Sequence, residues 1–155
     1  VMGGAMGGFA SLGRLLSVST TIQGQWASGP LLSFEEFSVG NLTIGRGYDP
    51  GVTSGDKALG IRLEPRVQLP IKSRLGVQAF AFYDSVRIWN DDVFTTERDR
   101  NLQSWGGGMR FTLPGMMALE ATYARPEDPE LNLPGARRAS DRVLLSLTAQ
   151  FAPRR

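Results

Sequence analysis

The chain contains no cysteine and no histidine among its 155 residues. Without cysteine there is no disulfide, no thiol nucleophile and no thiolate metal site. Without histidine the chain lacks the usual general base and the commonest zinc ligand. Hydrolases that depend on an imidazole are therefore excluded in their common forms, and we expect neither an enzyme nor a bound metal or cofactor.

Long apolar runs and a strong net charge are also missing. No run of roughly 18 apolar residues is present, so we expect no transmembrane helix. Lys+Arg total 17 against 15 Asp+Glu, and because the basic residues are scattered we expect no nucleic-acid partner. The start, VMGGAMGGFASLG, does not have the form of a signal peptide. We therefore expect the chain to begin inside a longer protein. Within this start, we interpret the glycine-rich stretch GGAMGG (3–8) as a flexible turn.

The pattern that is present has a period of two. In LSVSTTIQGQW (16–26) the apolar side chains and the polar side chains fall on alternate positions. A helix cannot segregate residues at that period, whereas a strand must. We predict further strands at 59–68, 75–85, 104–113, 117–124 and 143–151, and no segment shows the 3.6-residue period of a helix.

The connections between these strands alternate in length. Residues 69–74 and Pro114-Gly115 form short connections, whereas the segments 27–56, 89–101 and 125–141 are long and polar. Short turns at one end and long loops at the other are typical of an outer-membrane β-barrel. We therefore predict an all-β fold that forms part of an antiparallel transmembrane β-barrel. The polar faces of its strands would line a wet lumen, and they carry Arg62, Glu64, Arg66 and Glu120.

A soluble β-sandwich or lipocalin-like barrel also shows alternation. Charges on the inward faces argue against it, as do aromatic residues near strand ends, namely Trp26, Tyr83, Trp89, Trp105 and Tyr123. Six strands are fewer than the roughly eight of the smallest bacterial barrels, and an open edge in lipid is costly. We therefore expect residues 1–155 to be the C-terminal portion of a larger barrel of about 16 strands, with earlier strands and periplasmic domains upstream.

Three stretches carry more specific information. Within the longest connection, IGRGYDPG (44–51) places Arg46 and Tyr48 among glycines, which by itself is ordinary turn chemistry. FYDSV (82–86) places an aspartate two residues after a phenylalanine. The last strand ends at the aromatic residue Phe151. Jointly and in this order, they resemble the haemolysin secretion/activation transporters (ShlB/FhaC/HecB-like), the pore partners of two-partner secretion.

The resemblance implies a role for the long connection. The family carries a Val/Ile-Arg-Gly-Tyr/Phe signature at the tip of an extracellular loop that folds back into the pore. Arg46, Gly47 and Tyr48 match this signature, whereas Gly45 stands where the branched aliphatic residue usually lies. The loop of about 27–56 would then be a plug, and these three residues its latch.

The second and third stretches are matched in the same way. The family's Phe-x-Asp-x-Gly motif corresponds to Phe82 and Asp84, with Val86 in place of the glycine. The resemblance implies that Arg46 forms an ion pair with Asp84 inside the lumen. It also implies a C-terminal assembly signal that comprises Leu147, Ala149 and Phe151. A polar tail at 152–155 follows this signal.

Such a protein would lie in the bacterial outer membrane, in contact with its lipid. It would translocate an unfolded partner exoprotein of the haemolysin or adhesin type without nucleotide hydrolysis. The barrel assembly machinery would recognise its last strand. Two alternatives stay open: a barrel assembly or insertion factor of the same superfamily, which has the same latch, and a passive diffusion porin.

Overall fold

The computed structural model describes residues 1–40, 44–71, 74–91, 99–129 and 135–149. These ranges contain nine strands and no helix, and within them no helix is long and apolar enough to cross a membrane. The strands are β1 (Met2–Leu12), β2 (Leu16–Trp26), β3 (Phe37–Ser38), β4 (Ser54–Gly55), β5 (Lys57–Leu69), β6 (Gly76–Trp89), β7 (Asp99–Leu113), β8 (Met117–Pro126) and β9 (Arg142–Ala149).

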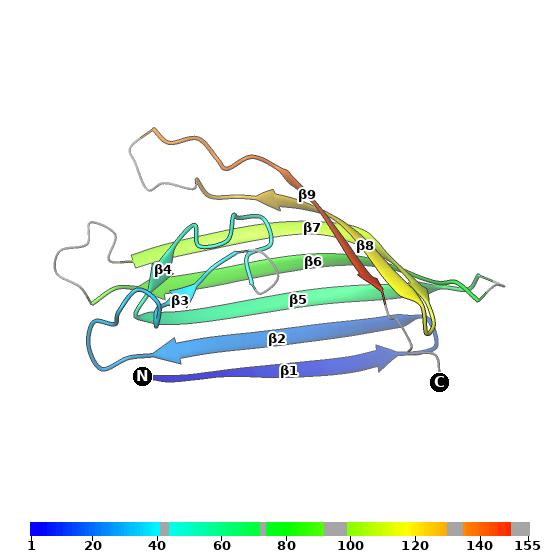
Figure 1. Ribbon diagram of the computed structural model, residues 1–155, viewed down its shortest axis with the longest axis horizontal. Coiled ribbons are helices and arrows are strands. Elements are labelled where there is room, and N and C mark those ends of the chain that lie inside the picture. Colours follow the sequence, from blue (N-terminus) through cyan, green and yellow to red (C-terminus); the bar gives the residue numbers. More distant parts are fainter. Residues whose placement is uncertain (41–43, 72–73, 92–98, 130–134, 150–155) are drawn as a thin grey trace.

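Seven strands form one antiparallel sheet, in the order β1-β2-β5-β6-β7-β8-β9 (Figure 1). Neighbours in the sheet are also neighbours along the chain, except that β3 and β4 pair with each other inside the connection from β2 to β5. No ladder joins β1 to β9 among the described residues, so the sheet is open. The arrangement is that of part of a β-barrel wall, as predicted.

The first strand corrects the sequence analysis, which interpreted residues 3–8 as a flexible turn. These residues lie inside β1, which pairs with β2 from Met2 opposite Trp26 to Leu12 opposite Leu16. The interpretation was wrong because glycine and alanine side chains are too small to show an alternating pattern, whereas the ladder hydrogen bonds come from the backbone. The sheet therefore has seven strands rather than six.

The lengths of the connections agree with the prediction. Short turns join β1 to β2, β5 to β6 and β7 to β8, and the strand ends that they join lie together at one end of the sheet (Figure 1). The strand ends with the longer connections lie at the other end. The connection predicted at 89–101 is shorter than expected, because β6 continues to Trp89 and β7 begins at Asp99.

The two faces of the sheet have opposite chemistry, and the apolar face is the exposed one. On β5, Leu59, Ile61 and Leu63 are 44–46% exposed, whereas Glu64 is 3% exposed. On β6, Asp84 is completely buried. A soluble sandwich or lipocalin-like barrel buries its apolar face instead. An exposed apolar face combined with buried charges is typical of the wall of a membrane β-barrel rather than of a soluble sandwich.

Candidate functional site

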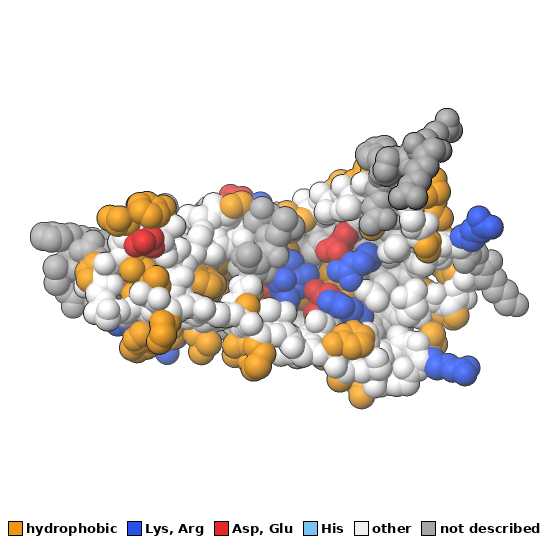
Figure 2. Space-filling model, turned by 60° about the horizontal axis from the view of Figure 1, so that its bottom comes forward, with side chains coloured by type: hydrophobic (Ala, Val, Ile, Leu, Met, Phe, Trp, Pro, Cys, Tyr) orange, Lys and Arg blue, Asp and Glu red, His pale blue; other side chains and the backbone are white. Residues whose placement is uncertain are grey.

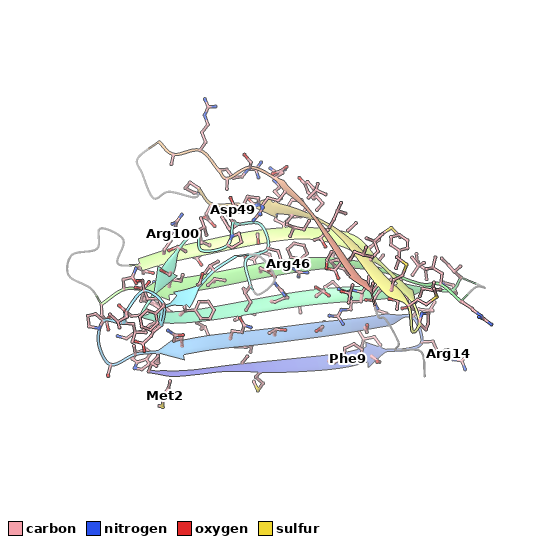
Figure 3. The ribbon with its side chains drawn as sticks, in the orientation of Figure 1. Met2, Phe9, Arg14, Arg46, Asp49 and Arg100 are labelled. Atoms are coloured by element: carbon pink, nitrogen blue, oxygen red, sulfur yellow. The ribbon has the colours of Figure 1, made fainter. Side chains whose placement is uncertain are left out.

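The connection between β2 and β5, residues 27–56, folds back over the polar face of the sheet, which we call the inner face. Three residues of this connection, which we call the β2–β5 loop, are Val39, Ile44 and Tyr48. They are buried in one apolar cluster with residues of the wall, namely Ala58, Val86, Ile88 and Leu102. Figure 3 shows Arg46 over the middle of the sheet. The loop is therefore packed against the wall and does not extend away from the strand ends.

Gly45 explains how the chain turns into the sheet. Its φ angle is +91°, in the left-handed region that favours glycine. A Cβ atom at this position would lie 2.7 Å from Cγ1 of Val39. Ile44, one position before Gly45, is 1% exposed and fills the space above Gly60.

The Arg46 side chain is 8% exposed and contacts two carboxylates. Its Nη1 donates a hydrogen bond of 2.7 Å to Oε2 of Glu64. Its Nε lies 3.5 Å from Oδ2 of Asp84, which is within ion-pair distance but makes no hydrogen bond. The guanidinium carbon lies 3.7 Å from the ring centroid of Phe82, a close cation–π contact. Arg46 is thus adjacent to Asp84, but its hydrogen-bonded partner is Glu64.

Asp84 binds the backbone of the β2–β5 loop. Its Oδ2 accepts hydrogen bonds from the amides of Gly45 and Arg46, at 3.0 and 3.1 Å. Arg62 donates to both carboxylate oxygens, at 2.9 Å from Nε and 3.0 Å from Nη2. Arg62 and Asp84 face each other across the β5–β6 ladder. The Asp84 carboxylate therefore holds the loop chiefly by hydrogen bonds to backbone amides of the loop.

Seven charged side chains form one group on the inner face, which we call the lumen cluster: Arg46, Arg62, Glu64, Arg66, Asp84, Arg110 and Glu120. Glu64 also accepts a hydrogen bond from Nε of Arg66, at 2.8 Å, and Arg110 forms an ion pair of 2.6 Å with Glu120. A cavity of about 360 Å³ adjoins the cluster. Figure 2 shows basic and acidic side chains gathered in the middle of the molecule.

Two glycines of β7 make room for the aromatic rings below Arg46. Gly106 lies opposite Phe82 in the ladder, and Gly108 lies opposite Phe80. A Cβ atom on Gly106 would lie 2.9 Å from the Phe82 ring, and one on Gly108 would lie 2.8 Å from the Phe80 ring. The rings can therefore lie across β7, which places Phe82 below the guanidinium.

Gly47 and Tyr48 fix the rest of the loop tip. The Gly47 amide donates to Oγ of Ser104 at 3.3 Å, and a Cβ atom on Gly47 would lie 2.6 Å from the Ser104 side chain. Tyr48 is completely buried, and burial raises the pKa of its phenol to about 12. The phenol is therefore protonated at neutral pH and can donate a hydrogen bond.

The C-terminal residues of the predicted assembly signal are only partly described. Leu147 and Ala149 lie on β9 and point to the exposed face, and Leu147 is 62% exposed. Phe151 and the tail at 152–155 lie outside the described residues. The four lumen residues predicted from the strand pattern, Arg62, Glu64, Arg66 and Glu120, lie on the inner face.

Sequence reasoning missed several residues that contact the β2–β5 loop. Ser104, Asp128 and Arg142 bind the loop tip, and none of them belongs to a motif that we identified. Arg110 could have been found, because it alternates with the outward apolar residues of β7 and faces Glu120 in the β7–β8 ladder. The other contacts depend on how the loop folds back, which the strand pattern does not reveal.

Comparison with known proteins identifies a family to which the sequence is similar. The model of the family described as haemolysin secretion/activation protein ShlB/FhaC/HecB matches residues 6–111. The chain is 29% identical over 116 residues to the heme/hemopexin transporter protein HuxB of Haemophilus influenzae, which covers 72% of this chain and 20% of that protein. HuxB of Haemophilus influenzae strain 86-028NP is 28% identical over the same length.

The chain thus spans about a fifth of the length of the curated relatives that it matches. No solved structure matches it. The family match covers more than half of the chain, includes the loop that carries Arg46 and ends on β7. The chain belongs to the haemolysin secretion/activation family, ShlB/FhaC/HecB.

Proposed function

We propose that this chain forms part of an outer-membrane pore through which an unfolded partner exoprotein reaches the cell surface, and that residues 27–56 plug this pore. The observation that carries the proposal is the position of Arg46. It is buried on the inner face, in contact with Glu64, Asp84 and the ring of Phe82. A loop held in this way blocks the lumen and can still be released.

The chemistry of the cluster suits a plug that must open. Arg46 is held by charge-assisted contacts and by ring stacking, which need a fixed geometry. Glu64 and Asp84 each have another arginine as a partner, Arg66 and Arg62. Both carboxylates therefore remain paired when the loop leaves. The wall does not have to bury an unpaired charge in the open state, which would cost about 3–5 kcal/mol.

Transport through such a pore needs no catalytic residue. The exoprotein crosses as an extended chain, and its folding outside the cell supplies the direction, so nucleotide hydrolysis is not required. Apolar residues of the outward face contact lipid, and the last strand is the contact for the barrel assembly machinery.

The test is Arg46→Ala in the full-length protein, with secretion of the exoprotein as the measurement. We expect secretion to be abolished or sharply reduced, while a heat-modifiable barrel remains in the outer membrane. Arg87→Ala is the matched control, because Arg87 is more than half exposed and pairs with Asp99 away from the loop. We expect the control to secrete normally.

Normal secretion by Arg46→Ala would refute the role of this residue as a latch. Unchanged secretion combined with failure to insert other barrels would favour the assembly factor instead. Steady conductance in lipid bilayers, without transitions between open and closed levels, would favour the passive porin.

A further inference from the structure

The tip of the β2–β5 loop, which is the proposed plug, is held at a second place, two residues beyond Arg46 in the chain. The connection between β8 and β9 makes this contact. The Tyr48 phenol donates a hydrogen bond of 2.7 Å to the carbonyl oxygen of Gln103 on β7. The same phenol oxygen accepts a hydrogen bond of 3.1 Å from the amide of Asp128. The ring thus joins the loop to both β7 and the β8–β9 connection.

Asp128 closes this group of contacts. Its carboxylate accepts a hydrogen bond of 2.7 Å from the amide of Gln103 and lies 3.4 Å from the Tyr48 phenol oxygen. Ala139, from the far side of the same connection, donates its amide to the carbonyl oxygen of Asp128 at 3.2 Å and packs in the apolar cluster that contains Tyr48. The described ends of the connection therefore enclose the tyrosine.

Arg142, the first residue of β9, binds the next residue of the loop. Its Nη2 lies 2.8 Å from Oδ1 of Asp49, and its Nη1 donates to the carbonyl oxygen of Tyr48. Figure 3 shows that Asp49 lies apart from Arg46, toward the upper strands of that view. Arg142 and Tyr48 are 94 residues apart in the sequence. This contact exists only because the loop folds back onto the last strand.

We propose that Asp128 and Arg142 are positioning residues that hold Tyr48 and Asp49, so that the plug leaves the lumen only when the β8–β9 connection releases the loop tip. We call this set of contacts the tip clamp. The proposal rests on the proposed function of residues 27–56 as a plug. It adds that the plug is attached at two sites, the lumen cluster and the tip clamp, and that the second site is formed by another long connection together with the first residue of β9.

The tip clamp differs from the lumen cluster in its chemistry. The contacts of Arg46 in the lumen cluster are mainly between side chains. In the tip clamp, Gln103 takes part only through its backbone amide and carbonyl groups, and Asp128 contacts Tyr48 through both its backbone amide and its carboxylate. Movement of the β8–β9 connection would therefore break the Tyr48 contacts of the clamp without a change of charge in the lumen. Opening can then begin on the side of the long connections.

The experiment measures single-channel conductance of the full-length protein in planar lipid bilayers. Tyr48→Phe removes only the phenol oxygen, and Arg142→Met removes the guanidinium but keeps a long side chain. We expect the open-state frequency to rise roughly three- to tenfold in each, the range for the loss of one net hydrogen bond. Arg142→Lys keeps the charge beside Asp49 and should recover part of the effect, which a purely packing role would not predict.

Arg125→Met is the matched control. Arg125 lies on β8, close to the same connection, but it pairs with Glu127 and stacks on Trp105 at the outward face. We expect wild-type opening in this variant. Wild-type opening in both Tyr48→Phe and Arg142→Met, or an equal rise in the control, would overturn the tip clamp.

Double variants separate the two attachment sites. Tyr48→Phe combined with Asp128→Ala should open less often than the product of the two single effects predicts, because the phenol and the Asp128 carboxylate share a contact of 3.4 Å and both bind Gln103. Tyr48→Phe combined with Arg46→Ala should show the product of the two single effects. If Arg46→Ala opens and secretes like wild type while Arg142→Met opens more often, the role of Arg46 as a latch is refuted and the tip clamp is supported. If Arg46→Ala abolishes secretion and the clamp variants open normally, the clamp alone fails.

Discussion

Nη1 of Arg46 lies 2.7 Å from Oε2 of Glu64, and the two side chains are 8% and 4% exposed. The resemblance to the family pointed to Asp84 as the partner of this arginine, and Asp84 is indeed adjacent at 3.5 Å. The hydrogen bond nevertheless goes to the neighbouring strand. The two carboxylates therefore have different roles, since Glu64 binds the Arg46 side chain and Asp84 binds the loop backbone.

The first prediction concerns Glu64. Glu64→Gln keeps the shape of the side chain but leaves Arg46 and Arg66 without their shared carboxylate, and breaking a buried pair costs up to about 3–5 kcal/mol. We expect more frequent opening in bilayer recordings. Glu120→Gln removes a lumen carboxylate that is 30% exposed and pairs with Arg110, so its effect should be under about 1 kcal/mol. Equal effects of the two changes would contradict the role of Glu64.

The second prediction concerns Asp84. Asp84→Asn replaces one acceptor oxygen by a donor, which then faces the loop amides or Arg62. We expect the loss of secretion to be at least as severe as in Arg46→Ala. Exchange of the two charges, Arg46→Asp with Asp84→Arg, should not restore secretion, because an arginine at position 84 cannot accept from the amides. Recovery in the double variant would show that the side-chain pair is what matters.

The third prediction uses the backbone of Gly45. Gly45→Ala places a Cβ atom at a φ of +91° and 2.7 Å from Val39, so the docked loop should be destabilised by about 1–3 kcal/mol. Limited proteolysis of intact cells should then cleave the loop faster than in wild type. Gly29→Ala is the control in the same loop, because a Cβ atom there meets nothing within 4 Å. Cleavage at the wild-type rate in Gly45→Ala would rule out this conformation.

The fourth prediction tests the glycines of β7. A Cβ atom on Gly106 would lie 2.0 Å from the carbonyl oxygen of Tyr123 and 2.9 Å from the Phe82 ring. Gly106→Ala should therefore displace the ring below Arg46 and lower the free energy of unfolding by about 1–3 kcal/mol. Unfolding by urea in detergent or lipid measures this free energy of unfolding. Gly8→Ala on β1, where a Cβ atom meets nothing within 4 Å, should have little effect, and a similar loss there would contradict the packing argument.

The strands with alternating side chains could be predicted, and the structure contains all six of them. β2 and β5 alternate because successive side chains of a strand point to opposite faces, a purely local property of the backbone. The same property assigned Arg62 and Glu64 to the inner face. β1 escaped prediction for the complementary reason, since its glycines and alanines give no contrast between the faces.

The contacts of the β2–β5 loop could not be predicted in this way. Arg46 and Glu64 are 18 residues apart and Tyr48 and Arg142 are 94 apart, and nothing local in the chain relates them. The sequence by itself determined six strands of the sheet and the inward position of Arg62, Glu64, Arg66 and Glu120, because these follow from a period of two. Only the tertiary structure decided which carboxylate binds which arginine and that β9 reaches the loop tip, because those pairings depend on strand register and on the path of a loop that folds back across the sheet.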